Sequence, residues 1–296
     1  MTDGILVLNA GSSSLKAAVY SVAGQGNTRL APHLTARVQN IGHAPIWTAK
    51  DANGAAIPDT VLRGDETDHE TVLGRLLDWL HARDDGVTVR AAGHRIVHGG
   101  TTYDRPVRID DGVLTDLDAL VPLAPLHQPH NLAPVRALWS RSPDLPQVAC
   151  FDTAFHRTQP ELAQRFALPR ALTAEGVKRY GFHGLSYAAI ADVLPDYLGD
   201  RADGRVVVAH LGHGASMCAL RNRRSVATTM GFTALDGLPM GTRCGNVDPG
   251  VALYLLQQKG WTADEVADAL YHRSGHYGVS GVSDDMAVLL ASDDPR

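Results

Sequence analysis

Near its start the chain reads Ile5-Leu6-Val7-Leu8-Asn9-Ala10-Gly11-Ser12-Ser13-Ser14-Leu15-Lys16, and this stretch indicates the fold. Four apolar residues followed by turn-forming residues predict a buried strand, a tight turn and a returning strand. The same arrangement recurs later, with a strand at 205–211, a turn at 212–216 and a returning strand at 217–220. We infer a duplicated core in which each half of the chain contributes one hairpin.

Both turns are rich in glycine and serine. Such turns let backbone N–H groups approach an anion closely, because few side chains obstruct it. Neither turn matches the Walker pattern G-x-x-x-x-G-K-[ST], and neither leads directly into a helix. Each turn alone is also compatible with an ordinary hairpin, whereas two turns in matching settings favour phosphate binding.

The remaining pattern alternates strands and helices. Residues 24–66 predict a meander of short strands, and Thr67 with Glu70 forms a capping box before a helical repeat of leucines. A strand at 147–151 precedes Asp152, where we place the boundary between two domains, 1–151 and 152–296.

Four further helices are expected in the second half. One has Asp248 as its cap and Pro249 at its first position, and Gly260 closes it. Another begins after Ser186 and is expected to stop near Pro195, because proline cannot donate a backbone hydrogen bond. Thr262 and Glu265 form another capping box, and a short helix follows Ser283.

Composition narrows the class of protein. The 296 residues are 44% hydrophobic and 20% charged, and the net charge of −5 argues against a nucleic-acid or acidic-membrane partner. The apolar runs are too short to span a bilayer, and the N-terminus lacks the pattern of a signal peptide. Three cysteines without a C-x-x-C pair indicate reduced thiols, so we expect a cytoplasmic protein.

A few polar residues stand out from the ordinary surface. Arg95 and Arg243 lie in apolar, glycine-flanked stretches, where an unpaired charge is costly and where carboxylate or phosphate recognition is favoured. Asp152 follows a strand, which suits either a functional carboxylate or a turn residue. The spacing of His94 and His98 lacks the glutamate of a zinc-protease helix, so zinc is disfavoured.

Read together, these segments resemble the acetate kinase family of short-chain carboxylate kinases, in the superfamily of sugar kinases, actin and the large heat-shock chaperones. The resemblance rests on ordered motifs: Asn9-Ala-Gly-Ser-Ser-Ser-Leu-Lys16, Arg95-Ile-Val-His-Gly-Gly100, Leu126-His127, Phe151-Asp-Thr-Ala-Phe-His156, Arg179-Tyr-Gly-Phe-His-Gly184, His210-Leu-Gly-His-Gly-Ala-Ser216 and Gly237-Leu-Pro-Met-Gly-Thr-Arg-Cys-Gly245. It implies an α/β fold of two lobes, each with an actin- or ribonuclease H-like mixed sheet flanked by helices, and a cleft between the lobes.

The resemblance also implies roles for individual residues. The catalytic residues would be Arg95, Asp152, His183 and Arg243. The carboxylate substrate would contact Arg95, Val97, Leu126, His127 and Arg243, and Asn9 would lie at the metal. The residues expected to bind the nucleotide and its phosphates are Ser12, Ser14, Lys16, His210, Gly212, His213, Gly214 and Asp285.

The implied reaction is reversible in-line transfer of the γ-phosphoryl of ATP to acetate, giving acetyl phosphate and ADP. Mg²⁺ or Mn²⁺ would be the cofactor, and the implied assembly is a homodimer. A carboxylate is already ionised at neutral pH, so the reaction needs charge neutralisation and positioning rather than a general base.

Three departures from the family pattern keep alternatives open. His213 stands where the family has Asn, Ala287 stands where it has Arg, and the chain ends before the family's adenosine loop and final helix. One alternative is therefore a shortened kinase remnant that binds ligands or dimerises without turnover. The other is a propionate or butyrate kinase, and a sugar kinase fits less well because paired arginines suit a carboxylate.

Overall fold

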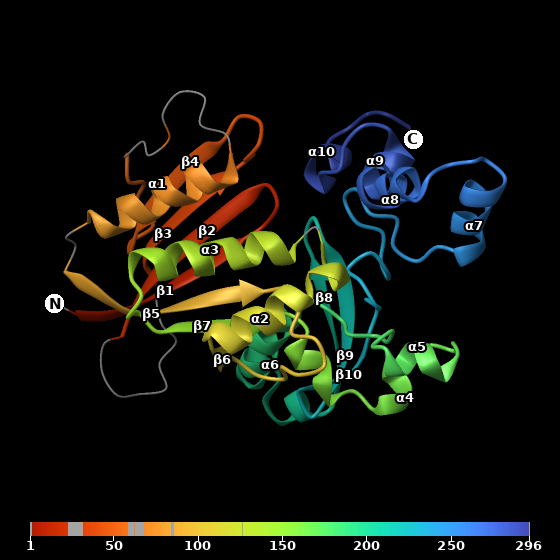
Figure 1. The fold of residues 1–296 in the computed structure, drawn as a ribbon, viewed down its shortest axis with the longest axis horizontal. Helices are drawn as coiled ribbons and strands as arrows, with labels where there is room; N and C mark the ends of the chain where they lie inside the picture. Colours follow the sequence, from red (N-terminus) through yellow and green to blue (C-terminus); the bar gives the residue numbers. More distant parts are fainter. Residues whose placement is uncertain are drawn as a thin grey trace. The chain divides into compact units, whose positions relative to one another are not determined.

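The computed structural model describes residues 2–22, 32–58, 62, 68–83, 86–125 and 127–295. The chain forms two compact units, Met1–Phe151 and Asp152–Arg296. Each unit has its own sheet and its own helices (Figure 1).

Unit 1 contains a seven-stranded mixed sheet in the order β4-β3-β2-β1-β5-β7-β6. Strand β1 pairs antiparallel with β2 and parallel with β5, so it lies in the interior of the sheet. Strand β7 is parallel to β5, and the other neighbouring pairs are antiparallel. The strands are β1 (Thr2–Ala10), β2 (Ser14–Ser21), β3 (Pro32–Gln39), β4 (Ile46–Asp51), β5 (Val87–Ile96), β6 (Val107–Arg108) and β7 (Gln147–Phe151).

The helices of unit 1 are α1 (His69–His81), α2 (Asp111–Ala119), η1 (Val121–Leu123) and α3 (Gln128–Arg141). Helix α1 packs on α3, and α3 packs on β1 and β5. The side chain of Asp68 caps α1 by accepting the N–H of Thr71, whereas the expected cap, Thr67, lies outside the described residues. Alternate apolar residues of β1 and the leucine face of α1 meet in one core.

Unit 2 contains a three-stranded antiparallel sheet, β10-β9-β8. Helix α6 covers it, and the core joins Tyr187, Ala191 and Leu194 of that helix to Cys218 and Leu220. The elements are η2 (Ala154–Thr158), α4 (Glu161–Gln164), α5 (Arg170–Ala174), α6 (Gly184–Leu198), η3 (Gly199–Asp203), β8 (Arg205–Leu211), β9 (Ala215–Arg221), β10 (Arg224–Thr228), α7 (Pro249–Gln257), α8 (Ala263–His272), α9 (Gly275–Ser280) and α10 (Met286–Leu290).

The expected end of helix α6 was wrong. The helix continues through Pro195 to Leu198, and the Pro195 carbonyl accepts the N–H of Gly199. A proline inside a helix costs about 3 kcal/mol. Packing of Leu194 before the proline and of Leu198 after it against the core of unit 2 offsets this cost.

The capping box of Thr262 and Glu265 is confirmed at the start of α8, and the final helix is confirmed as α10. Both follow from contacts between residues close in sequence, which local patterns predict well.

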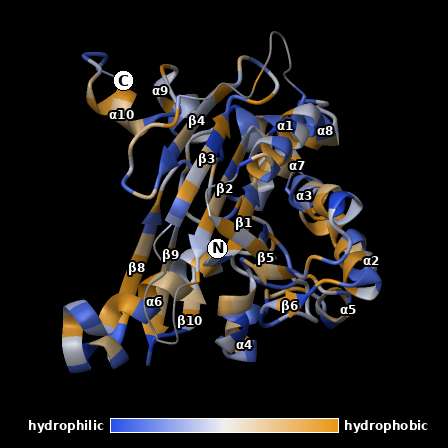
Figure 2. Ribbon diagram, turned by 90° about the vertical axis from the view of Figure 1, so that its left-hand side faces the viewer, coloured by the Kyte–Doolittle hydropathy of each residue, from blue (hydrophilic) through white to orange (hydrophobic). Residues whose placement is uncertain are grey.

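The sequence prediction of an α/β fold with sheets flanked by helices is confirmed. In Figure 2, strand β8 is coloured mainly hydrophobic, in keeping with its valine run. None of the helices in the described part of the chain is long and apolar enough to cross a membrane.

Candidate functional site

The first glycine–serine turn joins β1 to β2 in unit 1. It closes on itself, because the N–H of Gly11 donates to the carbonyl of Ser14 at 2.7 Å. The ring of His69 donates from Nε2 to the Gly11 carbonyl at 2.9 Å, while Ser12 is exposed. The turn is therefore held by its backbone, which leaves the Ser12 hydroxyl accessible to a ligand.

Positive charge gathers beside this turn. Nη1 of Arg95 donates to Oδ1 of Asn9 at 3.1 Å, and Asn9 lies opposite Lys16 across the strand pair. Lys16 in turn lies opposite Arg37 of β3. Partial burial lowers the pKa of Lys16 first, and the charges of Arg37 and Arg95 lower it further. An anion bound here would relieve this repulsion.

A hollow of about 600 Å³ lies over the same face of the sheet, and Asn9, Lys16 and Arg37 are among its lining residues. The predicted residues Asn9, Lys16 and Arg95 are thus brought together in unit 1.

Asn131 of α3 is hydrogen-bonded to three segments near the expected substrate pocket. Its Oδ1 accepts the N–H of Val97 at 2.7 Å, and its Nδ2 donates to the Ala10 carbonyl at 2.6 Å. The N–H of Asn131 bonds the carbonyl of His127, the residue that precedes α3. Val97, His127 and the end of β1 are therefore all hydrogen-bonded to one buried residue, Asn131, while Leu126 lies outside the described residues.

The second turn joins β8 to β9 in unit 2, and it closes through a bond from the Gly212 N–H to the Gly214 carbonyl at 3.1 Å. A Cβ atom placed on Gly214 would lie 3.3 Å from Nε2 of His183 and 3.5 Å from Nη2 of Arg243. Glycine at this position therefore leaves open the point toward which an imidazole and a guanidinium converge. Arg243 is oriented by donating from Nη1 to the Ala234 carbonyl at 2.7 Å.

The backbone of His183 has an uncommon conformation. Its φ of 60° is left-handed, and the residue caps the start of α6. The next residue must be glycine, because a Cβ on Gly184 would lie only 2.2 Å from the carbonyl oxygen of Asp152. That carbonyl accepts the Gly184 N–H at 2.8 Å. The close approach ties the buried Asp152 to the residue after His183.

The ring of His183 is held on two sides. Its Nδ1 hydrogen-bonds Oγ of Ser216 at 2.8 Å, and it stacks on the ring of His210 with centroids 4.1 Å apart. Oγ of Ser216 also bonds the hydroxyl of Tyr187. Sequence reasoning missed Ser216 and Tyr187 as site residues, although Tyr187 lies one helical turn after His183 and Ser216 ends a quoted motif.

Two predicted nucleotide residues have their polar atoms engaged elsewhere. Nε2 of His213 pairs with the carboxylate of Asp284 at 2.9 Å, and the His213 ring lies against Gly241. The carboxylate of Asp285 caps α10 by accepting the N–H of Ala287.

Asp152 has the chemistry to hold a divalent cation. It is a carboxylate only 2% exposed, and Mg²⁺ is commonly bound through one or two carboxylates together with water and substrate phosphates. Asn9 fits this role less well, because its side-chain oxygen already accepts from the positive guanidinium of Arg95. In the described ranges, no group of three or more His, Cys, Asp or Glu side chains is arranged so that it could hold a metal ion.

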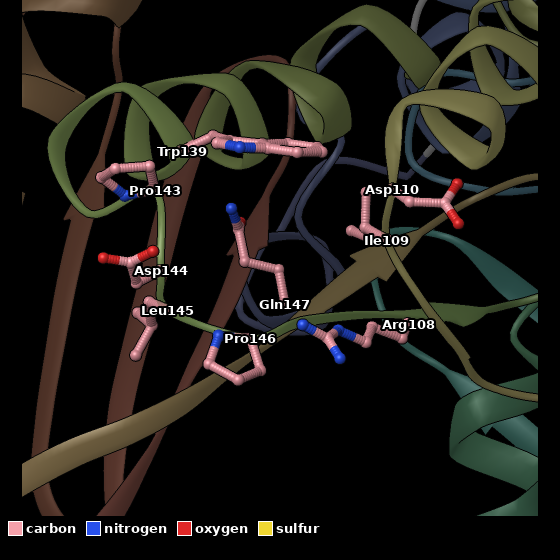
Figure 3. Close-up of a pocket in the computed structure, with 9 residues that line it drawn as sticks. All are labelled: Arg108, Ile109, Asp110, Trp139, Pro143, Asp144, Leu145, Pro146 and Gln147. Atoms are coloured by element: carbon pink, nitrogen blue, oxygen red, sulfur yellow. The ribbon is translucent and has the colours of Figure 1, made fainter.

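A further hollow of about 400 Å³ in unit 1 lies where β6 and β7 approach the end of α3 (Figure 3). Its lining includes Arg108, Asp110, Trp139, Asp144 and Gln147. Asp110 is committed to capping α2 through the Val113 N–H. This hollow includes none of the site residues predicted from the sequence.

Comparison with known proteins places these features in a family. The model of the acetokinase family matches residues 4–295. The chain is 54% identical to an acetate kinase of Rhodopseudomonas palustris over 299 residues, which covers all of this chain and 74% of that protein. It is 49% identical to an acetate kinase of Rhizobium meliloti, covering 99% of this chain and 74% of that protein.

Solved structures that are similar to this chain include kinases of short-chain carboxylates. A propionate kinase from Francisella tularensis superposes with a TM-score of 0.87 at 35% identity, covering 99% of this chain and 74% of that one. An acetate kinase from Porphyromonas gingivalis superposes with a TM-score of 0.81 at 35% identity, covering 98% of this chain and 72% of that one. The chain belongs to the acetokinase family.

Proposed function

We propose that this chain is an acetate kinase that transfers the γ-phosphoryl of ATP to acetate, forming acetyl phosphate and ADP, and catalyses the reverse reaction. The observation that carries the proposal is the convergence of His183 Nε2 and Arg243 Nη2 on the open point beside Gly214. Two nitrogen donors aimed at one space suit a transferring phosphoryl group, whose oxygens carry negative charge in the transition state.

In unit 2, His183 donates a hydrogen bond from Nε2 to a phosphoryl oxygen, and Arg243 neutralises charge on the same group. The stacked ring of His210 limits rotation of His183. Because residues 212 and 214 are glycines, no side chain at these two positions obstructs the approach of phosphate oxygens to the turn. Fixed donors of this kind need no rearrangement during the reaction, which is the main source of their catalytic effect.

In unit 1, Arg95 holds the acetate carboxylate, and Asn9 orients Arg95 through its amide oxygen. Lys16 and the serines of the first turn attract phosphate oxygens. Asp152 holds a divalent cation, which supplies charge neutralisation for the nucleotide phosphates when bound. We propose Mg²⁺ because a hard carboxylate oxygen suits it.

The choice between acetate and propionate depends on the apolar surface near Val97. That side chain is 3% exposed and its backbone is fixed by Asn131, so the wall is rigid. One additional methylene is worth only about 1–3 kcal/mol in a hydrophobic pocket. We therefore expect propionate to be a slower substrate rather than an excluded one.

The test is a hydroxamate assay that traps acyl phosphate from ATP and Mg²⁺ with acetate, propionate or butyrate. We expect acetate to give the highest kcat/KM and Arg243→Ala to reduce it by about 10²–10³, the effect of removing one transition-state donor. Arg165→Ala is the control, because Arg165 is a half-exposed arginine of the same unit that pairs with Glu161. Folded wild-type protein without turnover on any of the three acids would refute the proposal.

A further inference from the structure

Two buried hydroxyl groups lie behind His183, on the side away from Gly214. Ser216 and Tyr187 are each 0% exposed, and neither belongs to the site predicted from the sequence. Ser216 Oγ lies 2.8 Å from Nδ1 of His183 and 2.5 Å from the hydroxyl of Tyr187. Together the three side chains form one continuous hydrogen-bonded chain.

We propose that Tyr187 and Ser216 are positioning residues that keep the proton of His183 on Nε2, so that this nitrogen acts as a hydrogen-bond donor. The inference rests on the proposed function, in which His183 donates to the transferring phosphoryl group. It concerns how the protein sets the protonation pattern of that ring.

The direction of the hydrogen bonds follows from a fixed donor at one end. A backbone hydrogen bond from His210 is one of the causes that act on the pKa of the Tyr187 phenol, and it lowers that pKa. Since a backbone N–H only donates, the phenol accepts that bond and must place its own proton on Ser216 Oγ. Ser216 then directs its proton to Nδ1 of His183, which must be the unprotonated nitrogen of a neutral ring.

Burial supports this direction. It raises the pKa of Tyr187, so the phenol keeps its proton at neutral pH. The opposite direction would require the hydroxyl proton of Tyr187 to find an acceptor other than Ser216, and its described hydrogen-bond partners are Ser216 and a backbone donor. A buried hydroxyl proton without an acceptor costs about 1–3 kcal/mol.

The position of the proton on His183 matters for the proposed reaction, because Nε2 faces the space beside Gly214. This nitrogen lies 3.3 Å from the position that a Cβ of Gly214 would occupy, beside Nη2 of Arg243. With the proton on Nε2, both groups at this point are donors. With the proton on Nδ1, a nitrogen lone pair would face the oxygens of the phosphoryl group and repel them.

The first measurement is the tautomer of His183 in the full chain. Long-range ¹⁵N–¹H NMR of histidine-labelled protein at pH 8.5, where an ordinary imidazole is neutral, distinguishes the two ring nitrogens. His183→Gln identifies the signals. We expect a protonated Nε2 and an Nδ1 that accepts a hydrogen bond. A wild-type ring protonated on Nδ1 overturns the proposal.

The variants Ser216→Ala and Tyr187→Phe then break the chain of hydrogen bonds. We expect a fraction of the ring to carry its proton on Nδ1, and kcat to fall about tenfold, less than the 10²–10³ for deleting a donor. KM for acetate should change less than kcat. If both variants keep the wild-type tautomer and kcat, the proposal is wrong.

Ser225→Ala is the matched control. Ser225 is an equally buried serine of the same sheet, and its hydroxyl bonds His156 rather than His183. We expect it to leave the His183 tautomer unchanged. If wild-type protein showed no kinase activity, the proposed function would fail, and the tautomer measurement would still decide this inference independently.

Discussion

The two hairpins have nearly the same sequence pattern and very different surroundings. Strand β1 pairs on both sides, with β2 and β5, while β8 pairs only with β9 among the described strands. Leu8 in β1 is 1% exposed, whereas Leu211, which ends the strand of the second hairpin, is 75% exposed. An apolar run therefore predicts a strand without predicting how deeply that strand is buried.

The two turns also differ in the side chains that surround them. The first is held by hydrogen bonds from His69 and Asn131 to its backbone carbonyls, and Ser12 and Ser13 are exposed. The second is flanked by the side chains of His183 and Arg243, for which we propose a role in phosphoryl transfer. One hairpin supplies a rigid turn beside a positive surface, and the other supplies the space in which donors converge.

The largest expected effect tests the difference in burial. Leu8→Ala should lower the free energy of unfolding by about 2–5 kcal/mol, because it opens a cavity in the core that the sheet shares with the helices of unit 1. The same change at Leu211 should alter it by less than about 0.5 kcal/mol. Urea denaturation of both variants measures the contrast, and equal losses would show that β8 is as buried as β1.

The next effect tests how the first turn is held. Asn131→Ala leaves the Val97 N–H and the Ala10 carbonyl without their buried partner, at about 1–3 kcal/mol for each unsatisfied group. The unfolding midpoint in urea should fall accordingly. Asn53→Ala, at an exposed position in the same unit, is the control. If the urea midpoint of Asn131→Ala falls no further than that of the control, water replaces the hydrogen bonds of the Asn131 side chain.

A smaller effect compares the two turns directly. Gly214→Ala should reduce kcat/KM about tenfold, because its methyl group occupies the space between His183 and Arg243. Gly11→Ala should reduce it less, since a Cβ there lies 3.4 Å from the flexible Oγ of Ser14. The hydroxamate assay gives both values, and the reverse order would assign the critical turn to unit 1.

The last prediction concerns the effect of acid on His94, which lies in strand β5 beside the first hairpin. Burial lowers the pKa of His94 to about 4, below the value near 6.5 of an unfolded chain. The unfolded state therefore binds more protons between these values, and stability falls as pH drops from about 6.5 to 4, by up to about 1.4 kcal/mol per pH unit.

His94→Gln removes this group and should flatten that dependence. Urea midpoints between pH 7.5 and 4.5 measure the slope for wild type and variant. Parallel curves would show that His94 does not contribute to the acid sensitivity.

Local patterns predicted most of the helices and strands, and the site residues stay a prediction. The capping box at Thr262, the strand before Asp152 and both hairpins depend on neighbouring residues, which the sequence displays directly. The end of helix α6 was wrong because Pro195 lies between residues that pack into the core. The helix propensities of individual residues do not contain information on that packing.

The sequence by itself determined the family, the two glycine–serine turns and the arginine and histidine motifs, because each motif is continuous in the chain. The tertiary structure alone decided which partners those residues take. His183 meets a serine 33 residues away, and His213 meets a carboxylate 71 residues away. Hydrogen bonds and ion pairs form only between groups a few ångströms apart. They therefore depend on which distant segments folding brings together.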